Sequence, residues 1–400
     1  MIVLAGAVLV LPDRVIDAGS LVLGEGRIQS IHDRTIEKPA GATYVDLAGH
    51  VIVPGFIDVH VHGVEGVDVL DDEQAVARVA ATLPKYGVTA FCPTSIACTP
   101  EKLSALLAGV NRARSSPAPG SARVLPAHLE SNFINPEFNG AQPLTCLRLP
   151  QRQGAQGARG ADAFTGDDIL DVIAKQRSSV GIVTLAPELP GGIELVRDLV
   201  THGHRVSLGH TGATYEQARA AIDAGARHAT HLFNRMSLMS SRAPGVTGAV
   251  LESTAVAAEL ICDGVHVHPA LLSMAIRAKT ARRMMAITDG TAGTGLPTGS
   301  RTRIGDRSIV VTDRCALLED GTLAGSILSM DAAFRTLVSE VKLSLSDASR
   351  MCSTTPAEEL GLADYGSIAV GKTADLVVLT RDLRVRHTYL DGENLEPRSN

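Results

Sequence analysis

The chain has 400 residues, of which 45% are hydrophobic, and carries a formal net charge of -6. It contains no Trp and only 3% aromatic residues, which disfavours a surface that binds ligands by aromatic stacking. Acidic and basic residues are interspersed, so no basic patch predicts nucleic-acid binding. No run reaches the ~20 apolar residues of a membrane helix, and the apolar first residues lack the basic region of a signal peptide. We therefore expect a cytoplasmic protein with neither a nucleic-acid nor a membrane partner.

Both ends of the chain predict β-structure. Residues 1–54 read as short strands and turns, with Gly24-Glu25-Gly26 as a hairpin connection. Residues 366–379 are similar and end in the apolar run 375–379. A Gln/Gly/Arg-rich stretch at 152–160 predicts a surface loop.

The middle of the chain alternates strand and helix. Asp71 with Gln74 predicts the start of a helix that runs to about Leu83, and Thr214 with Gln217 predicts another. Such alternation implies βαβ units and a parallel sheet, either doubly wound or closed into a barrel. The positions of the candidate metal ligands favour the barrel.

Five segments each place histidine or a carboxylate at the end of an apolar strand. The residues in chain order are His60 with His62, then Glu130, His210, His231 and Asp289. Catalytic groups of a (β/α)8 barrel come from the carboxyl ends of several strands. We therefore predict an α/β chain with a (β/α)8 TIM-type barrel. Such a barrel needs roughly 250 residues, so we assign it residues 55–344 and expect residues 1–54 plus 345–400 to form a small β-sandwich.

The residue types predict metal-assisted hydrolysis. Neutral imidazoles with one carboxylate suit Zn²⁺ or a similar ion, and Fe²⁺, Co²⁺ or Mn²⁺ remain alternatives. A bound ion lowers the pKa of water toward ~7. Asp289 would then take a proton from that water and return it to the leaving group.

The order of these motifs resembles the N-acetylglucosamine-6-phosphate deacetylases of the amidohydrolase superfamily. The resemblance covers nearly the whole chain and includes the segments around residues 54–63, 128–141, 231–234, 242–245, 263–266 and 323–326. It implies a homodimeric enzyme that converts N-acetylglucosamine 6-phosphate and water into glucosamine 6-phosphate and acetate.

The resemblance also implies roles for single residues. Glu130, His210 and His231 would bind the principal metal, and His60 and His62 would add a second position. Asp289 would be the general acid and base. Asn234, Arg242 and His266 would contact the sugar phosphate, with Arg242 reaching in from a neighbouring subunit.

Three departures from the family pattern fall on the substrate side. Ser131-Asn132 replaces Gly-Pro, Gln142 replaces a histidine that lies against substrate, and Arg235 replaces a small residue. We expect Gln142 and Arg235 to contact the substrate, and Arg235 to add a further contact to an anion. These changes keep open another N-acetylhexosamine or another amidohydrolase reaction on an amide or cyclic amide. A catalytically silent barrel would require loss of the metal ligands or of Asp289, and all are present.

Overall fold

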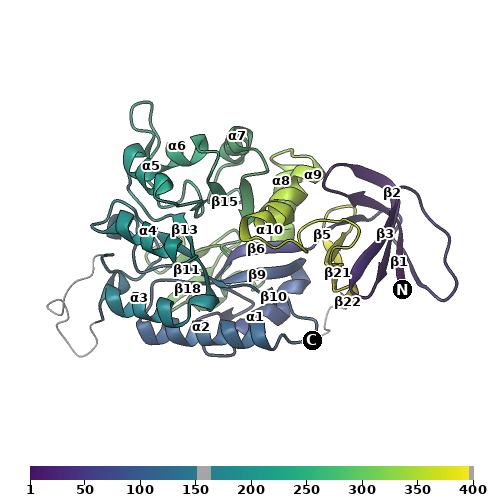
Figure 1. Ribbon diagram of the computed structural model, residues 1–400, viewed down its shortest axis with the longest axis horizontal. Coiled ribbons are helices and arrows are strands. Elements are labelled where there is room, and N and C mark those ends of the chain that lie inside the picture. The colour runs from purple at the N-terminus through teal and green to yellow at the C-terminus, as the bar shows by residue number, and fades with distance from the viewer. Residues whose placement is uncertain (151–163, 396–400) are drawn as a thin grey trace.

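The computed structural model describes residues 1–150 and 164–395, so the loop expected at 152–160 lies outside the described residues. Figure 1 shows a barrel wrapped by helices, with a separate β-sheet on one side that contains the N-terminus. The earliest and the latest strands of the chain, coloured purple and yellow, lie side by side in that second sheet.

The barrel is formed by parallel strands in the order β6-β9-β11-β12-β13-β14-β15-β16, and β10 pairs with β9 beside them. It closes where β16 meets β6, through a bridge between Val61 and Gly290 and a hydrogen bond from the Asp289 N–H to the His60 carbonyl of 3.0 Å. The predicted TIM-type barrel is therefore confirmed. Its strands are β6 (Phe56–Val61), β9 (Val88–Ser95), β10 (Arg123–Val124), β11 (Ala127–Glu130), β12 (Val180–Leu185), β13 (Arg205–Leu208), β14 (His228–Ala229), β15 (Ala257–Ile261) and β16 (Met284–Ile287).

Helices alternate with these strands and cover the outside of the barrel (Figure 1). They are α1 (Ala75–Thr82), α2 (Pro100–Ser115), α3 (Gly166–Lys175), α4 (Gly192–Thr201), α5 (Tyr215–Asp223), α6 (Gly245–Glu252), α7 (Pro269–Lys279), α8 (Met330–Ser339), α9 (Leu345–Ser349) and α10 (Thr355–Leu360). Shorter helical turns are η1 (Leu83–Tyr86), η2 (Pro136–Phe138), η3 (Leu144–Cys146), η4 (Arg177–Ser179) and the π-helical η5 (Arg350–Thr354).

One of the two predicted helix starts is correct. Thr214 and Gln217 form a reciprocal capping box at the start of α5. The expected box at Asp71 and Gln74 is wrong, because α1 begins only at Ala75. The Asp71 carboxylate instead accepts hydrogen bonds from the Asp68 N–H and the Arg303 guanidinium, at 3.1 and 2.7 Å, and is not available as a cap.

Both chain ends contribute to the second sheet, whose strand order is β22-β21-β20-β5-β1-β2-β3, with β4 also paired to β1. The predicted hairpin joins β2 to β3, and Glu25 and Gly26 both have positive φ, as a tight hairpin turn requires. The strands are β1 (Ile2–Val10), β2 (Val15–Gly24), β3 (Arg27–His32), β4 (Thr43–Asp46), β5 (Val51–Pro54), β20 (Leu376–Leu379), β21 (Val385–Leu390) and β22 (Glu393–Leu395).

Two small sheets lie after barrel strands. They are β7 (Gly63–Val64) with β8 (Val67–Asp68), and β17 (Arg301–Ile304) with β18 (Arg307–Val311) and β19 (Ala316–Leu318). The β17–β19 sheet shares a small apolar core with Ile96 and Ala324, which fixes it beside the carboxyl ends of the barrel strands.

The barrel core includes part of the segment that we assigned to the terminal sheet. Ala348, Met351 and Cys352 are buried in the same apolar cluster as the barrel strands. The division at residues 54/55 and 344/345 remains a prediction. Within the described residues, every helix is too short or too polar to cross a bilayer, and all six cysteines are free thiols.

Candidate metal centre and active site

Three predicted ligands converge at the carboxyl ends of β11, β13 and β14. One oxygen of Glu130 lies 2.7 Å from the Nε2 of His210 and 2.7 Å from the Nε2 of His231. The two imidazole nitrogens are 3.1 Å apart. We call Glu130, His210 and His231 the glutamate group; all three are buried, and their ligand atoms are close enough to share one ion.

A second set forms where β6 meets β16. The Asp289 carboxylate lies 3.3 Å from the Nε2 of His60 and 3.1 Å from the Nε2 of His62. The Nε2 atoms of the two imidazoles are 3.1 Å apart. We call His60, His62 and Asp289 the aspartate group, which is also buried and able to surround an ion.

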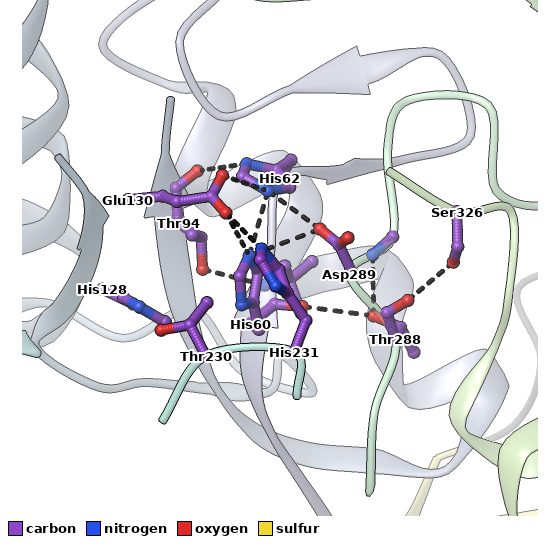
Figure 2. A network of polar contacts seen from close by, with 12 residues as sticks. His60, His62, Thr94, His128, Glu130, Thr230, His231, Thr288, Asp289 and Ser326 are labelled. Atoms are coloured by element: carbon purple, nitrogen blue, oxygen red, sulfur yellow. Dashed lines mark hydrogen bonds and ion pairs between the residues drawn. The ribbon is translucent and has the colours of Figure 1, made fainter. Parts of the chain in front are cut away.

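The two groups adjoin, and in Figure 2 His60 and His62 lie between Glu130 and Asp289. One Glu130 oxygen is 4.0 Å from the Nε2 of His60, and the other is 3.7 Å from the Nε2 of His62. The arrangement therefore has room for one ion in each group with a carboxylate shared between them.

The hydrogen bonds of the imidazole rings favour metal binding through Nε2. The Nδ1 atoms of His60, His62 and His210 face Glu259, the Thr94 carbonyl and the Phe138 carbonyl at 2.9, 3.0 and 2.7 Å. Since these partners accept hydrogen bonds, each Nδ1 carries a proton, and in the neutral ring, the form that binds a metal, Nε2 then presents a lone pair. Lone pairs and carboxylates aimed at the same points form a donor set suited to a divalent cation.

The electrostatics agree with this donor set. Burial alone would raise the pKa of Glu130, but His210 and His231 hold it well below its ordinary value. For Asp289, burial also raises the pKa, and His60 and His62 outweigh that effect, so the net pKa is lowered. Burial opposes a charge on His60, yet Glu259 and Asp289 raise its pKa to about 10. The surrounding carboxylates thus stabilise positive charge at this place, which is the charge that a divalent cation brings.

The backbone at three of these residues is in the left-handed region. The φ angles are 49° at His210, 28° at His231 and 51° at Asp289, which is unusual for residues other than glycine. Such conformations persist only where surrounding contacts fix them, and they cluster at functional sites. Next to Asp289, the Thr288 hydroxyl donates to buried Asp58 at 2.6 Å, which ties the end of β16 to β6.

A pocket opens directly above the two groups. Its polar lining includes most of the predicted site residues, and its apolar lining comes from Ala141, Ile261, Ile304 and Leu323. The polar residues are His62, Glu130, Gln142, His210, His231, Asn234, Arg235, His266 and Asp289. His60 lies beneath this surface. Arg242 is exposed on the loop after β14 and is not part of the pocket lining in the described residues.

The residues that depart from the family pattern have two kinds of environment. Ser131 and Asn132 turn inward, where Ser131 bonds the Thr184 carbonyl and Asn132 bonds those of Cys98 and Cys146. Gln142 accepts from the Ala97 N–H at 2.7 Å and donates to a Glu130 oxygen. Gln142 thus contacts both the pocket and the shared carboxylate.

Three buried polar residues beneath the site were not assigned a role from the sequence. Glu259 contacts His60 and His228, and His128 lies 3.6 Å from Glu259. A signal for Glu259 is present in the sequence, because it is a lone carboxylate inside the otherwise apolar run of residues 256–262. A charge at such a position needs a buried partner.

Comparisons with known proteins agree with the geometry. The model of the Amidohydrolase family matches residues 51–395. The N-acetylglucosamine-6-phosphate deacetylase of Bacillus subtilis (strain 168) is 33% identical over 392 residues, which cover 96% of this chain and 94% of that protein. The N-acetylgalactosamine-6-phosphate deacetylase of Escherichia coli O157:H7 is 32% identical over 380 residues, or 94% and 95% of the two chains. A solved structure of a Mycobacterium smegmatis N-acetyl-D-glucosamine-6-phosphate deacetylase variant, in complex with N-acetyl-D-glucosamine-6-phosphate, matches with a TM-score of 0.86 at 31% identity over 98% of each chain.

Proposed function

The chain belongs to the amidohydrolase family, and from this premise we propose that it is a metal-dependent deacetylase acting on an amino sugar 6-phosphate. The substrate is N-acetylglucosamine 6-phosphate, and the products are glucosamine 6-phosphate and acetate. The observation that carries the proposal is the convergence of the glutamate and aspartate groups under one pocket. The names of relatives that span nearly the whole chain supply the substrate class.

The metal ligands follow from the donor set. Glu130, His210 and His231 would hold the principal ion, and His60 and His62 would hold a second beside it, with Zn²⁺ as the ion that imidazole and carboxylate ligands favour. An ion held there supplies Lewis acidity to the acetyl carbonyl and lowers the pKa of a bound water toward ~7. The remaining steps belong to the chain itself.

Asp289 would move the proton. Because its pKa is lowered, it is a carboxylate at neutral pH and accepts a proton from the attacking water. As the C–O bond forms and the C–N bond breaks, Asp289 returns this proton to the leaving nitrogen. The immediate products are acetic acid and an amine, which at neutral pH become acetate and an ammonium group, and the Asp289 carboxylate is restored.

The residues around the pocket would bind the sugar phosphate. Asn234, Arg235 and His266 line it together, and the Nδ1 of His266 is held by Asp263 at 2.6 Å, which leaves Nε2 for a ligand. Gln142, fixed by Ala97 and Glu130, offers only a neutral amide to the substrate. This environment supports recognition of an anionic ligand by Arg235 and His266.

We further propose a homodimer in the cytoplasm. Arg242 lies on the same exposed loop as Leu238 and Met239, which are 92% and 51% exposed. Such strong exposure of apolar side chains is typical of a surface that is buried against another molecule. In such a dimer Arg242 would reach the phosphate in the neighbouring subunit's pocket.

A second candidate substrate is N-acetylgalactosamine 6-phosphate, because a relative with that activity covers 94% of this chain at 32% identity. An acetate-release assay decides between the candidates. It compares N-acetylglucosamine 6-phosphate, N-acetylgalactosamine 6-phosphate and both unphosphorylated sugars, with Asp289→Asn as the inactive control. We expect the highest kcat/KM for N-acetylglucosamine 6-phosphate. Equal rates on phosphorylated and neutral sugars would contradict the phosphate requirement, and no release from any of the four would reject the proposed function.

A further inference from the structure

Beneath the two candidate metal groups, the barrel interior contains a carboxylate that cannot reach the substrate. Glu259 extends from the centre of β15, is fully buried, and is absent from the pocket lining. Any part it has in the reaction must therefore pass through the residues that it contacts.

Three donors surround Glu259. Its two oxygens accept from the Nδ1 of His60 at 2.9 Å, from the backbone N–H of His231 at 3.1 Å and from the Nε2 of His228 at 2.8 Å. His60 belongs to the aspartate group and His231 to the glutamate group. One carboxylate oxygen, Oε2, receives both of these bonds and so connects the two groups.

The contact to His60 differs from those of the other ligand imidazoles. His62 and His210 are oriented by backbone carbonyls, whereas His60 is oriented by a charged side chain. Charge-assisted hydrogen bonds are about twice as strong as neutral ones. A carboxylate on the far nitrogen of a ligating histidine also fixes its tautomer and raises its basicity.

The contact to His231 acts on the backbone instead. His231 has a φ of 28°, and its own Nδ1 has no hydrogen-bond partner among the described residues. Its ring is therefore not oriented by a bond at Nδ1, as the other rings are. The hydrogen bond from its backbone N–H to Glu259 restrains the position of the His231 backbone, from which the imidazole extends.

His60, His128 and Glu259 are close enough to suggest a further metal site, but the hydrogen bonds of His128 argue against it. Its Nδ1 faces the Val59 carbonyl at 3.0 Å and its Nε2 the Thr184 hydroxyl at 2.7 Å, so both nitrogens already have partners. This cluster is a hydrogen-bonded support.

The support continues away from the pocket. The Nδ1 of His228 lies 3.6 Å from Glu359 of α10, and Glu359 pairs with Arg205 at 2.7 Å. Arg205 stands at the start of β13, at the opposite end of the barrel from the pocket. A buried charge is costly unless it is paired and hydrogen-bonded, and His60 and His228 supply that pairing for Glu259.

We propose that Glu259 is a positioning residue that holds His60 and His231 in ligating geometry and so controls the metal affinity of both groups. The inference rests on the proposed metal-dependent function. It predicts that Glu259→Gln, in which an amide group replaces one acceptor oxygen, weakens metal binding although no ligand is removed.

The test is a Zn²⁺ titration of protein stripped with a chelator, for the wild type, Glu259→Gln and the matched control Glu359→Gln. We expect Glu259→Gln to lower Zn²⁺ affinity by roughly 10–100-fold, as loss of such outer partners does. Glu359→Gln removes a buried carboxylate from the same chain of contacts without touching His60 or His231, and should leave the affinity unchanged. Thermal unfolding of each metal-free variant checks that it is folded.

The outcomes separate the two proposals. A wild type that binds no Zn²⁺ would contradict the proposed function. Wild-type affinity in Glu259→Gln, or an equal loss in Glu359→Gln, would overturn only the role of Glu259. If Glu259→Gln does not fold, ¹⁵N-histidine NMR of the Zn²⁺-loaded wild type, with the His60 signal assigned from His60→Gln, still decides. We expect His60 to carry its proton on Nδ1, and a proton on Nε2 would refute the proposal.

Discussion

The glutamate and aspartate groups offer similar atoms to a cation but are built differently. Glu130, His210 and His231 follow strands of the continuously hydrogen-bonded part of the barrel, and one carboxylate oxygen lies 2.7 Å from both imidazoles. The aspartate group spans the seam where β16 meets β6, which is closed by one β-bridge and a few backbone hydrogen bonds, and its carboxylate–imidazole distances are 3.1 to 3.3 Å. A group across a seam depends on supports outside its ligands, here Thr288 with Asp58 and Glu259. We therefore expect the glutamate group to be the tighter metal site, and we propose that the aspartate group contributes the reactive carboxylate.

The largest expected effect is on turnover. Asp289→Asn removes the proton acceptor but leaves the glutamate group intact, so kcat should fall by about 10²–10⁴-fold while one ion stays bound. Acetate release and metal analysis on the same preparation measure both. Near-normal turnover would remove Asp289 from proton transfer, and loss of all metal would make it a ligand of the principal ion.

Glu130→Ala should affect both groups at once, because Glu130 belongs to the glutamate group and also lies within 4.0 Å of His60 and His62. Loss of a direct ligand should cost more than the roughly 100-fold upper range for an outer partner, so the purified variant should contain almost no metal. Elemental analysis checks this. Full occupancy in Glu130→Ala would refute its assignment as a ligand.

The ligands of both groups could be predicted from the sequence. Alternation along a strand predicts that His60 and His62 share a face, and the barrel rule predicts that Glu130, His210, His231 and Asp289 end at one rim. These expectations agree with the structure because they depend only on local periodicity and on the direction of parallel strands.

The supports could not be derived in the same way. Glu259 meets His60 across 199 positions of sequence, through a contact that only the closed barrel creates. The wrong helix start at Asp71 has a similar cause, since Arg303, 232 positions away, competes for its carboxylate. Local sequence patterns predict the position of a residue on its strand or helix. Its hydrogen-bond partner depends on contacts between distant segments of the folded chain.

A paired substitution tests the difference between the groups directly. His210→Asn and His62→Asn each remove one imidazole of similar burial, from the glutamate and the aspartate group respectively. We expect His210→Asn to reduce Zn²⁺ affinity for the first ion, and His62→Asn to lower only the metal-to-protein ratio by affecting the second. Equal losses of the first ion in both variants would show that the two groups bind as one unit.

The smallest effect concerns a residue outside both groups. Arg242→Ala leaves every candidate metal ligand in place and removes one cation that we assign to the phosphate. The KM for N-acetylglucosamine 6-phosphate should rise by about tenfold, equivalent to ~1.4 kcal/mol, with little change in kcat or in KM for the neutral sugar. Arg381→Ala is the matched control, because Arg381 is exposed, follows β20 of the terminal sheet and does not line the pocket. An equal rise in KM for both sugars would show that Arg242 supports the loop rather than the phosphate. Because Arg242 lies outside the pocket of its own subunit, a selective effect on the phosphorylated sugar would also support a pocket completed by a second copy of the chain.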